Sequence, residues 1–357
     1  MRITKLVCCL GILFAACTCF AQTFTTFDPP TSTSTVPQAI NIFGQVTGYY
    51  TGQLDPLTYG VIHSFIRQPD GTITSFDVSA PGRTPRARDI NALGQITGTF
   101  DTPFVSEGFL RETDGTIVTF NGGSSVVPSG AAPLQAEPVP CTPYERCIDG
   151  TGPIAINALG KITGVFGNGS YSGFLRQPDG TTINFRVANS SSSVPQAINL
   201  LGQITGHYRD TRGITHGFLR KRNGAIVTFD PPNSTETTPV GINLTGQITG
   251  YFQDVNSVLH AFLRQPKGTF ITFDPTGSVG TQPTAINLEG QITGYYATAD
   301  GIYHGFLRRP NGQIETFNAP GGANAATFPK DINDLGQIVG YYQDANFALH
   351  GFVRSAR

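Results

Sequence analysis

The sequence has little charge and lacks several large side chains. Charged residues are 13% of its 357 residues, about half of the roughly 25% of an average globular protein, and it has no Trp and one Met. With 23 basic and 24 acidic residues the net charge is −1, which excludes a general binder of polyanions such as nucleic acid. The 43 Gly and 25 Pro stay below the roughly 25–30% that indicates disorder. Together with 25 Phe and 12 Tyr, they predict a folded chain of short strands and tight turns.

The first 21 residues have the pattern of a secretory signal peptide. Arg2 and Lys5 form a basic start, 6–16 are apolar, and Cys19-Phe20-Ala21 is a small-x-small cleavage site. The apolar run is shorter than the roughly 20 residues of a membrane-spanning helix, so no transmembrane segment is expected. The predicted location is secreted, periplasmic or extracellular. Residues 14–17 resemble a bacterial lipoprotein box with Phe in place of Leu, so lipid anchoring at Cys17 is the alternative.

Removal of this segment would leave two cysteines, Cys141 and Cys147. Two thiols in an oxidising compartment, with five residues between them, favour a disulfide. A zinc site would need further ligands, and no His lies nearby in the sequence. We therefore expect a disulfide and neither a metal nor a cofactor.

One sequence unit occurs seven times. It contains Ile-Asn-x-x-Gly-x-(Ile/Val)-(Thr/Val)-Gly, then typically His-Gly-Phe-Leu-Arg, then Gly-x-Ile-x-Thr-Phe-Asp. The first segment has its Asn at Asn41, Asn91, Asn157, Asn199, Asn243, Asn287 and Asn333. Each unit is predicted to form four short strands: a (Ala-Ile-Asn), b (Gln-Ile-Thr-Gly-Tyr-Tyr), c (His-Gly-Phe-Leu-Arg) and d (Thr-Ile-x-Thr-Phe-Asp). Seven such units, each about 44 residues long, predict an all-β, seven-bladed β-propeller.

The two ends of the repeat region complement each other. Residues 24–28 match strand d with no strands a to c before them, and the last unit stops after strand c at Arg354. The N-terminal strand is therefore expected to complete the last blade, which closes the ring and removes an exposed edge. We predict one domain over 22–357, with an inserted d–a loop at 121–153.

The runs 331–340 and His260-Ala261-Phe262-Leu263 resemble the HAF repeat family of bacterial extracellular proteins, which is named for its His-Ala-Phe triplet. The resemblance covers roughly 24–354. It implies secretion and a repeat scaffold, and it implies no activity.

Several polar residues repeat with the unit. A residue that recurs around a ring is expected to stabilise each blade, because an enzyme needs its base only once. This applies to the strand c arginines and to the histidines His63, His216, His260, His304 and His350. We expect each guanidinium to bind carbonyl groups and to lie against an aromatic ring. The imidazole N–H groups are expected to donate to the b–c loop residues Asp210, Asp254, Asp300 and Asp344. These loops are too short of ligands for calcium, so we interpret their Asp residues as turn formers.

The connections define two faces. The a–b and c–d turns are nearly constant in length and form the uniform face, whereas the b–c and d–a loops vary and form the variable face. Binding is expected on varied loops over a rigid frame. The candidate ligand-binding residues are Arg83, Arg86 and Arg88 in one d–a loop and Tyr144, Glu145 and Arg146 between the two cysteines. Tyr offers a stacking surface and Arg a bidentate donor, which together suit sugars or carboxylates.

The leading hypothesis is a monomeric, non-enzymatic scaffold that binds a glycan, a peptide or a cell-surface component through the variable face. The alternatives are an extracellular hydrolase or lyase with its site at the channel mouth, and a purely structural envelope or adhesion module. An enzyme should bring together the ionisable residues that occur in single repeats, namely Glu107, Glu145, His207 and Glu236. A binder should expose loop aromatics, such as Tyr59, Tyr144 and Tyr303.

Overall fold

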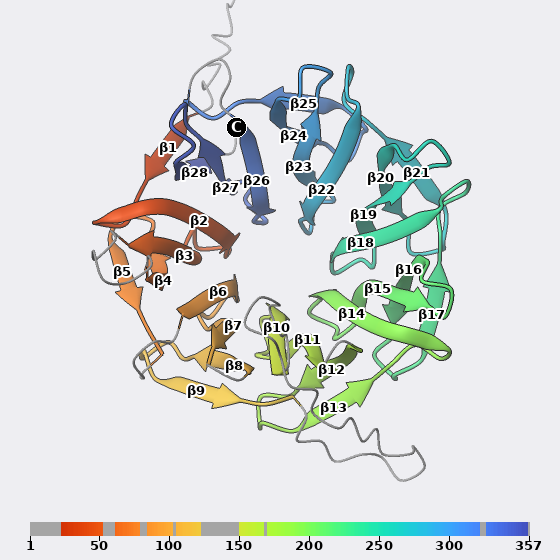
Figure 1. Cartoon of the computed structure of the whole chain (residues 1–357), viewed down its shortest axis with the longest axis horizontal. Helices are drawn as coiled ribbons and strands as arrows, with labels where there is room; N and C mark the ends of the chain where they lie inside the picture. Colours follow the sequence, from red (N-terminus) through yellow and green to blue (C-terminus); the bar gives the residue numbers. More distant parts are fainter. Residues whose placement is uncertain are drawn as a thin grey trace, which may run out of the picture.

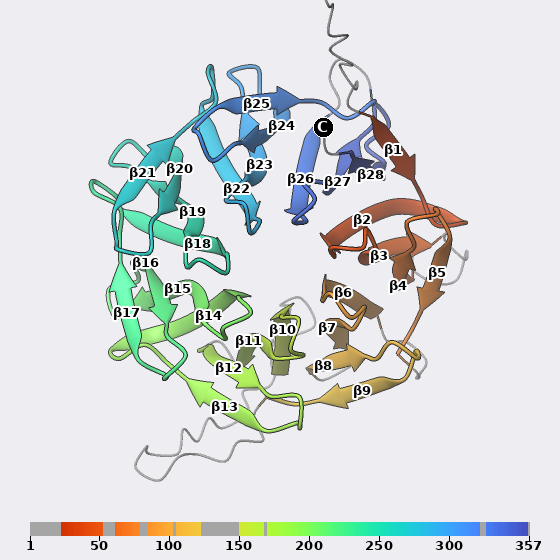
Figure 2. The same ribbon diagram turned by 180° about the vertical axis from the view of Figure 1, so that it is seen from behind.

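The computed structural model describes residues 23–52, 61–78, 84–102, 105–122, 150–167, 170–321 and 326–355. Within these ranges every regular element is a β-strand, and 28 strands form a ring of seven four-stranded blades (Figure 1; Figure 2 from behind). The predicted seven-bladed propeller is confirmed. The predicted signal peptide and the Cys141–Cys147 pair lie outside the described residues. None of the described residues belong to a helix long and apolar enough to cross a membrane.

Each blade is an antiparallel sheet whose strand a lies at the centre of the ring and whose strand d lies at the rim (Figure 1). The a strands of blades 1 to 7 are β2 (Ser32–Ile40), β6 (Thr84–Ile90), β10 (Gly150–Ile156), β14 (Ser190–Ile198), β18 (Glu236–Ile242), β22 (Gly280–Ile286) and β26 (Thr327–Ile332). The b strands are β3 (Val46–Gly52), β7 (Ile96–Asp101), β11 (Ile162–Gly167), β15 (Ile204–Asp210), β19 (Ile248–Gln253), β23 (Ile292–Ala297) and β27 (Ile338–Gln343). The c strands are β4 (Ile62–Arg67), β8 (Ser106–Arg111), β12 (Ser172–Arg176), β16 (Thr215–Arg220), β20 (Leu259–Arg264), β24 (Tyr303–Arg308) and β28 (Leu349–Arg354). The d strands are β5 (Ile73–Phe76), β9 (Ile117–Phe120), β13 (Thr182–Phe185), β17 (Ile226–Phe229), β21 (Phe270–Phe273), β25 (Ile314–Phe317) and, in blade 7, β1 (Phe24–Phe27).

The N-terminal strand closes the ring as expected. β1 pairs antiparallel with β28, from Phe24 opposite Arg354 to Phe27 opposite Gly351. The Phe24 ring packs on Phe352 with 5.7 Å between centroids, and Phe27 packs on Phe65 of blade 1 at 6.0 Å. Blade 7 therefore consists of strands from both ends of the chain, and β28 has β1 as a partner on its outer side.

The core lies between the blades. The strand c phenylalanine is fully buried in every blade, as Phe65, Phe109, Phe174, Phe218, Phe262, Phe306 and Phe352. The strand b glycine that faces it also has no space for a side chain. A Cβ atom at Gly48 would lie 2.3 Å from the carbonyl oxygen of Val36, so β2 and β3 can approach only because this residue is glycine.

A closed ring of hydrogen bonds joins the a–b turns on the uniform face. The side-chain Nδ2 of each repeat Asn donates to the backbone carbonyl of the next repeat Asn, at 2.9–3.2 Å, and Asn333 donates to Asn41. Each Asn Oδ1 also accepts a backbone N–H of its own turn, such as that of Gln45 at 3.0 Å. Asn is a favoured first residue of a type I turn, and here the same side chain also joins the blades.

The strand c arginines lie against aromatic rings, as predicted, and through these rings they join neighbouring blades at the rim. Each guanidinium lies over the strand d phenylalanine of the preceding blade, with 4.4–5.0 Å between the Cζ atom and the ring centroid. In five blades the same guanidinium donates to the carbonyl of the next residue, at 3.2–3.4 Å. Arg354 instead donates to Glu315 at 2.6 Å.

Two predicted boundaries need correction. The inner strands begin several residues earlier than the predicted Ala-Ile-Asn, because pairing with strand b continues past a register shift after a proline or alanine. Arg86 and Arg88 therefore lie in β6 and not in a d–a loop. The inserted segment also ends earlier than expected, since Gly150 to Pro153 already belong to β10.

A candidate binding site at the ring axis

Besides their b–c and d–a loops, the blades differ from one another at one position of the inner strand, close to the ring axis. The register shift in each inner strand leaves one unpaired residue, and its identity changes from blade to blade. In chain order these residues are Gln38, Arg88, Ile154, Gln196, Val240, Thr284 and Lys330. The contacts that hold the blades together recur around the ring, so this variation is not required for the fold.

Four tyrosines occupy the same strand b position in consecutive blades around the ring, from blade 5 through blade 7 to blade 1. We refer to Tyr251, Tyr295, Tyr341 and Tyr49 as the tyrosine arc. Burial raises the pKa of Tyr295 to about 12, and the neighbouring Tyr251 and Tyr341 add to this rise. Burial and the proximity of Tyr49 likewise raise the pKa of Tyr341. The phenols of Tyr295 and Tyr341 therefore remain protonated and able to donate hydrogen bonds, as Tyr295 does to Gln282 at 2.9 Å.

The arc continues into an aromatic cluster between blades 6 and 7. Phe328 lies at the centre, with its ring centroid 5.3 Å from Tyr295, 5.2 Å from Tyr303 and 5.1 Å from Tyr341. Tyr303 begins β24 directly after a b–c loop and is 37% exposed, in agreement with the prediction that Tyr303 is an exposed aromatic residue next to a loop. The cluster therefore reaches the surface at the variable face.

Two cations lie beside the arc. Arg88 is exposed and Lys330 is half-buried, with its Nζ atom 5.6 Å from the centroid of the Tyr341 ring. Burial lowers the pKa of Lys330, and the positive charge of Arg88 lowers it further. The surrounding blades partly desolvate the Arg88 guanidinium and lower its pKa, which Tyr49 partly offsets. Among the described residues neither side chain has an ion-pair partner. We call Arg88, Lys330, Phe328 and the tyrosine arc the axial site.

The other predicted binding residues have different outcomes. Arg86 donates to Asp101 at 2.7 Å, so its charge is already neutralised within blade 2. Arg83, Tyr144, Glu145 and Arg146 lie outside the described residues, as does Tyr59. Arg88 is thus the predicted residue that the structure places in the axial site.

Two carboxylates join blades near the axis. Asp331 accepts the backbone N–H of Ile40 at 2.9 Å, and Asp89 accepts that of Ile156 at 2.7 Å. Most other blades carry Ala at this position. Protein surrounds both side chains closely, and this desolvation raises the pKa of Asp89 to about 8 and that of Asp331 to about 6. The proximity of Asp331 adds to the rise at Asp89.

Of the ionisable residues that occur in single repeats, the structure describes Glu107, His207 and Glu236, and these three do not form one centre. His207 takes the strand b position of the arc in blade 4, and its buried Nδ1 atom has no hydrogen-bond partner among the described residues. Burial, together with the charge of Arg209, lowers the pKa of His207 to about 4. Glu107 lies in β8 of blade 2, and Glu236 is exposed at the start of β18 in blade 5. No hydrogen bond or ion pair between described residues connects these three.

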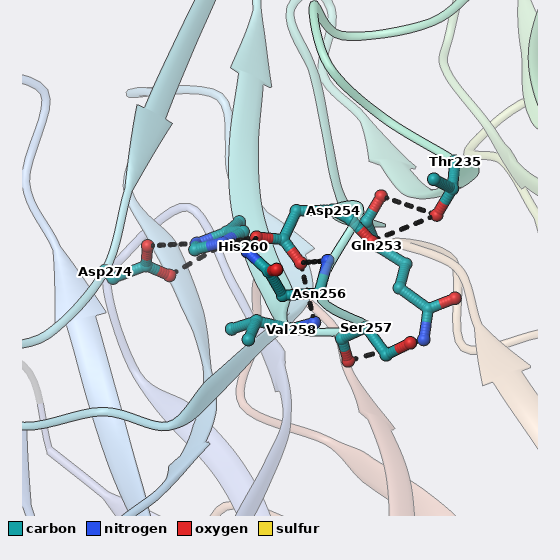
Figure 3. A network of polar contacts seen from close by, with 9 residues as sticks. Thr235, Gln253, Asp254, Asn256, Ser257, Val258, His260 and Asp274 are labelled. Atoms are coloured by element: carbon teal, nitrogen blue, oxygen red, sulfur yellow. Dashed lines mark hydrogen bonds and ion pairs between the residues drawn. The ribbon is translucent and has the colours of Figure 1, made fainter.

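The repeated histidines have a different main partner from the predicted one. In each case Nδ1 lies 2.7–2.9 Å from the Asp or Asn that follows strand d, as in the pair of His260 and Asp274 (Figure 3). The b–c loop Asp is farther away, with 3.7 Å between His260 Nε2 and Asp254. The reason is that Asp254 accepts the backbone N–H groups of Asn256 and Val258, both at 2.8 Å, which confirms its role as a turn former.

Comparison with known proteins identifies the fold. No family model matches the chain, and no curated protein matches it. Among solved structures, a streptogramin B lyase has a TM-score of 0.58 and 14% identity, covering 93% of this chain and 97% of that one. Virginiamycin B lyase from Staphylococcus aureus has a TM-score of 0.57 and 15% identity, covering 94% and 100%. The β-propeller domain of the Trilobed protease from Pyrococcus furiosus has a TM-score of 0.60 and 11% identity, covering 91% and 96%. At these identities the likeness shows the fold alone, and the chain is a β-propeller that resembles the propellers of these proteins.

Proposed function

We propose that the protein is a secreted, non-enzymatic scaffold that binds a ligand at the axial site, with access from the variable face, where Tyr303 is exposed. The ligand class that the site suits best is a glycan with carboxylate groups. The observation that carries the proposal is the combination, at the place where the blades differ, of four tyrosines with two cations that lack ion-pair partners among the described residues.

The chemistry of the site favours an acidic sugar over a neutral peptide. Sugar rings stack on aromatic faces, and the phenol hydroxyls of the arc can bond sugar hydroxyls. Arg88 and Lys330 supply positive charge for a carboxylate, and the guanidinium can bind it through two parallel hydrogen bonds. The strands that carry these residues are held by the Asn ring and by the Arg–Phe stacks. A preformed site loses less entropy when the ligand binds.

Secretion is part of the proposal. The signal-peptide pattern over 1–21 supports it, as does the resemblance of the repeats to the HAF family of bacterial extracellular proteins. A rigid binding module outside the cell would encounter polysaccharides of other cells or of its own envelope.

The experiment is a glycan and peptide array probed with the chain from residue 22 onward, followed by calorimetry with a single oligosaccharide. The axial variant combines Arg88→Ala with Lys330→Thr. Thr replaces Lys330 because blade 6 carries Thr at the same position, so the fold accepts it there. The control variant, Arg209→Ala with Arg212→Ala, removes the same charge from the end of strand b and from the b–c loop of blade 4. We expect the axial variant to weaken binding at least tenfold while the control binds as the unmodified protein does.

The reverse result would place the ligand outside the axial site and overturn the proposal. Mass spectrometry of the oligosaccharide after prolonged incubation tests the enzymatic alternative. The proposal requires the oligosaccharide to be unchanged, whereas shortened or unsaturated products would identify a hydrolase or a lyase.

A further inference from the structure

The uniform face carries an unusual set of exposed apolar side chains. Every a–b turn places at least one large apolar residue in solvent, next to the Asn ring that surrounds the axis. We call this set the apolar crown; it consists of Phe43, Leu93, Leu159, Leu200, Leu201, Leu244, Leu288 and Leu335. Their exposed fractions run from 37% at Leu244 to 67% at Phe43. Turn formation does not explain them, because the two central positions of such turns accept polar residues, as Thr245 and Glu289 show.

The crown is large enough to form an interface. Its side chains together expose on the order of 800 Å² of surface, similar to the area that each partner contributes to an interface of standard size. Monomeric proteins rarely expose a contiguous apolar patch of more than a few hundred Å². A second surface that covers the crown is therefore expected.

The charges around the crown identify that second surface. On the c–d turns, blades 1 to 3 carry the exposed acidic residues Asp70, Asp114 and Asp179. Blades 4 and 5 carry the exposed basic residues Lys221, Arg222 and Lys267, and blade 6 carries Arg309, which is half-buried in an ion pair with Glu315. One side of the face is therefore acidic and the other basic. Charged a–b turn residues lie closer to the axis, at Lys161, Glu289 and Asp334.

We propose that two copies of this chain associate through their uniform faces, crown against crown. The two-fold axis would lie in the interface and pass through blade 7 and between blades 3 and 4. Because the blades follow one another around the ring (Figure 1), this operation places blade 1 opposite blade 6 of the other copy, blade 2 opposite blade 5, and blade 3 opposite blade 4. The pairs of blade 2 with blade 5 and of blade 3 with blade 4 join an acidic c–d turn to a basic one, and in the third pair Asp70 faces Arg309, which is already paired with Glu315.

This register is the best match that the seven blades allow. If one copy is rotated by one blade about the ring axis in one direction, the acidic blade 3 lies opposite blade 3 of the other copy. If it is rotated by one blade in the other direction, the basic blade 4 lies opposite blade 4 of the other copy. In the proposed register, blade 7 faces its own copy and brings two Asp334 side chains together. This like-charge contact predicts that Asp334→Asn strengthens association. Both variable faces point away from the interface, so the dimer would present two axial sites in opposite directions.

The turn sequences provide substitutions that the fold already accepts. Asp114 and Lys267 occupy the same c–d turn position, in blades 2 and 5, and both are exposed. Asp114→Lys therefore introduces the residue of blade 5 into blade 2, and Lys267→Asp does the converse. Each single substitution places like charges opposite each other at two symmetric positions of the interface.

The test is sedimentation velocity of the chain from residue 22 onward, over concentrations from the micromolar range upward. We expect the unmodified chain to dimerise, either single substitution to raise the dimer dissociation constant at least tenfold, and an equimolar mixture of the two variants to restore it. In the mixture, the lysine introduced in blade 2 of one variant faces the aspartate introduced in blade 5 of the other, and each native partner is also complemented. The control mixture combines Asp114→Lys with Lys221→Asp, whose charges meet in no pair, and it should remain monomeric.

A second substitution tests the crown without changing charge. Leu93→Ser with Leu159→Ser should also abolish the dimer, and circular dichroism should show an intact fold because both side chains are exposed. A chain that stays monomeric at all concentrations would overturn the proposal. A dimer that ignores the charge substitutions, or equal recovery in the two mixtures, would overturn it as well.

Discussion

Replacement of Phe27 by Ala tests the closure of the ring at its one discontinuous blade. The Phe27 ring is 9% exposed, packs edge-on against Phe65 at 6.0 Å, and lies under the Arg67 guanidinium at 5.0 Å. Phe273 is its equivalent within the continuous chain. It is also 9% exposed, packs against Phe306 at 6.1 Å and lies under Arg308 at 4.8 Å.

These matched surroundings predict matched losses. Truncation of a buried Phe costs about 3–5 kcal/mol, from lost transfer free energy and from the cavity that remains. The lost contact with the guanidinium adds about 0.5–1 kcal/mol. We therefore expect Phe27→Ala and Phe273→Ala to lower the free energy of unfolding by similar amounts, about 3–5 kcal/mol, with Tm lower by about 5–10 °C for a domain of this size.

Urea denaturation followed by far-UV circular dichroism measures both variants. If β1 were unpaired in solution, Phe27 would be exposed before unfolding and its loss would cost well under about 1 kcal/mol. That result, together with a large loss for Phe273→Ala, would refute the closed ring.

Three further predictions follow from the described contacts and from the cysteine pattern. Burial raises the pKa of Asp89 to about 8 and that of Asp331 to about 6 in the folded chain, above the unfolded value, so their stabilising contribution is full below about pH 4 and is lost as the pH rises through 6 and 8. The Tm of the unmodified chain should therefore fall more over this pH range than the Tm of the double variant Asp89→Ala with Asp331→Ala. Equal pH profiles of the two proteins in thermal scans would contradict this. Asn199→Ala opens the Asn ring by removing the hydrogen bonds to the Asn243 carbonyl and to Gln203, and should lower the free energy of unfolding by about 2–3 kcal/mol in urea denaturation. Asn223→Ala, at an exposed position, should lower it by less than about 0.5 kcal/mol. Cys141 and Cys147 are predicted to form a disulfide, which intact-mass measurement before and after alkylation would establish, and two alkylated thiols in secreted material would disprove it.

The repeat made the architecture predictable from the sequence. Seven copies with short turns indicated seven blades, and the unmatched strand d at residues 24–28 indicated how the ring closes. The recurrence of the strand c arginines indicated that each lies against an aromatic ring, although not that this ring belongs to the preceding blade. These inferences need only the order of strands within one blade and the fact that blades are equivalent.

Contacts between blades were harder to predict. The repeat Asn has the sequence signature of a turn former, and its bond to the next blade depends on how closely the turns approach at the axis. In blade 5, His260 lies 14 residues before Asp274, its partner after strand d, and only six residues after the b–c loop residue Asp254. Proximity in the chain therefore favoured the wrong partner. Side-chain direction in the folded blade decides between the two.

The residues of the binding site were equally hard to predict from the sequence. Arg86 and Arg88 form one cluster in the sequence, but the register shift in β6 sends Arg86 to Asp101 and leaves Arg88 at the axis. Lys330 and the four tyrosines come from other repeats, and the sequence of a single repeat does not mark them as binding residues. A comparison of the seven copies position by position could have identified them, because they lie where the repeats differ and because the fold does not require these differences.

A crystal structure of the protein with the acidic oligosaccharide that binds best would test the central claim most directly. The account predicts that a sugar ring stacks on an aromatic face of the axial site and that its carboxylate lies about 3 Å from the guanidinium of Arg88 or from Nζ of Lys330. A ligand bound at the outer rim of the blades, or on the uniform face, would contradict it.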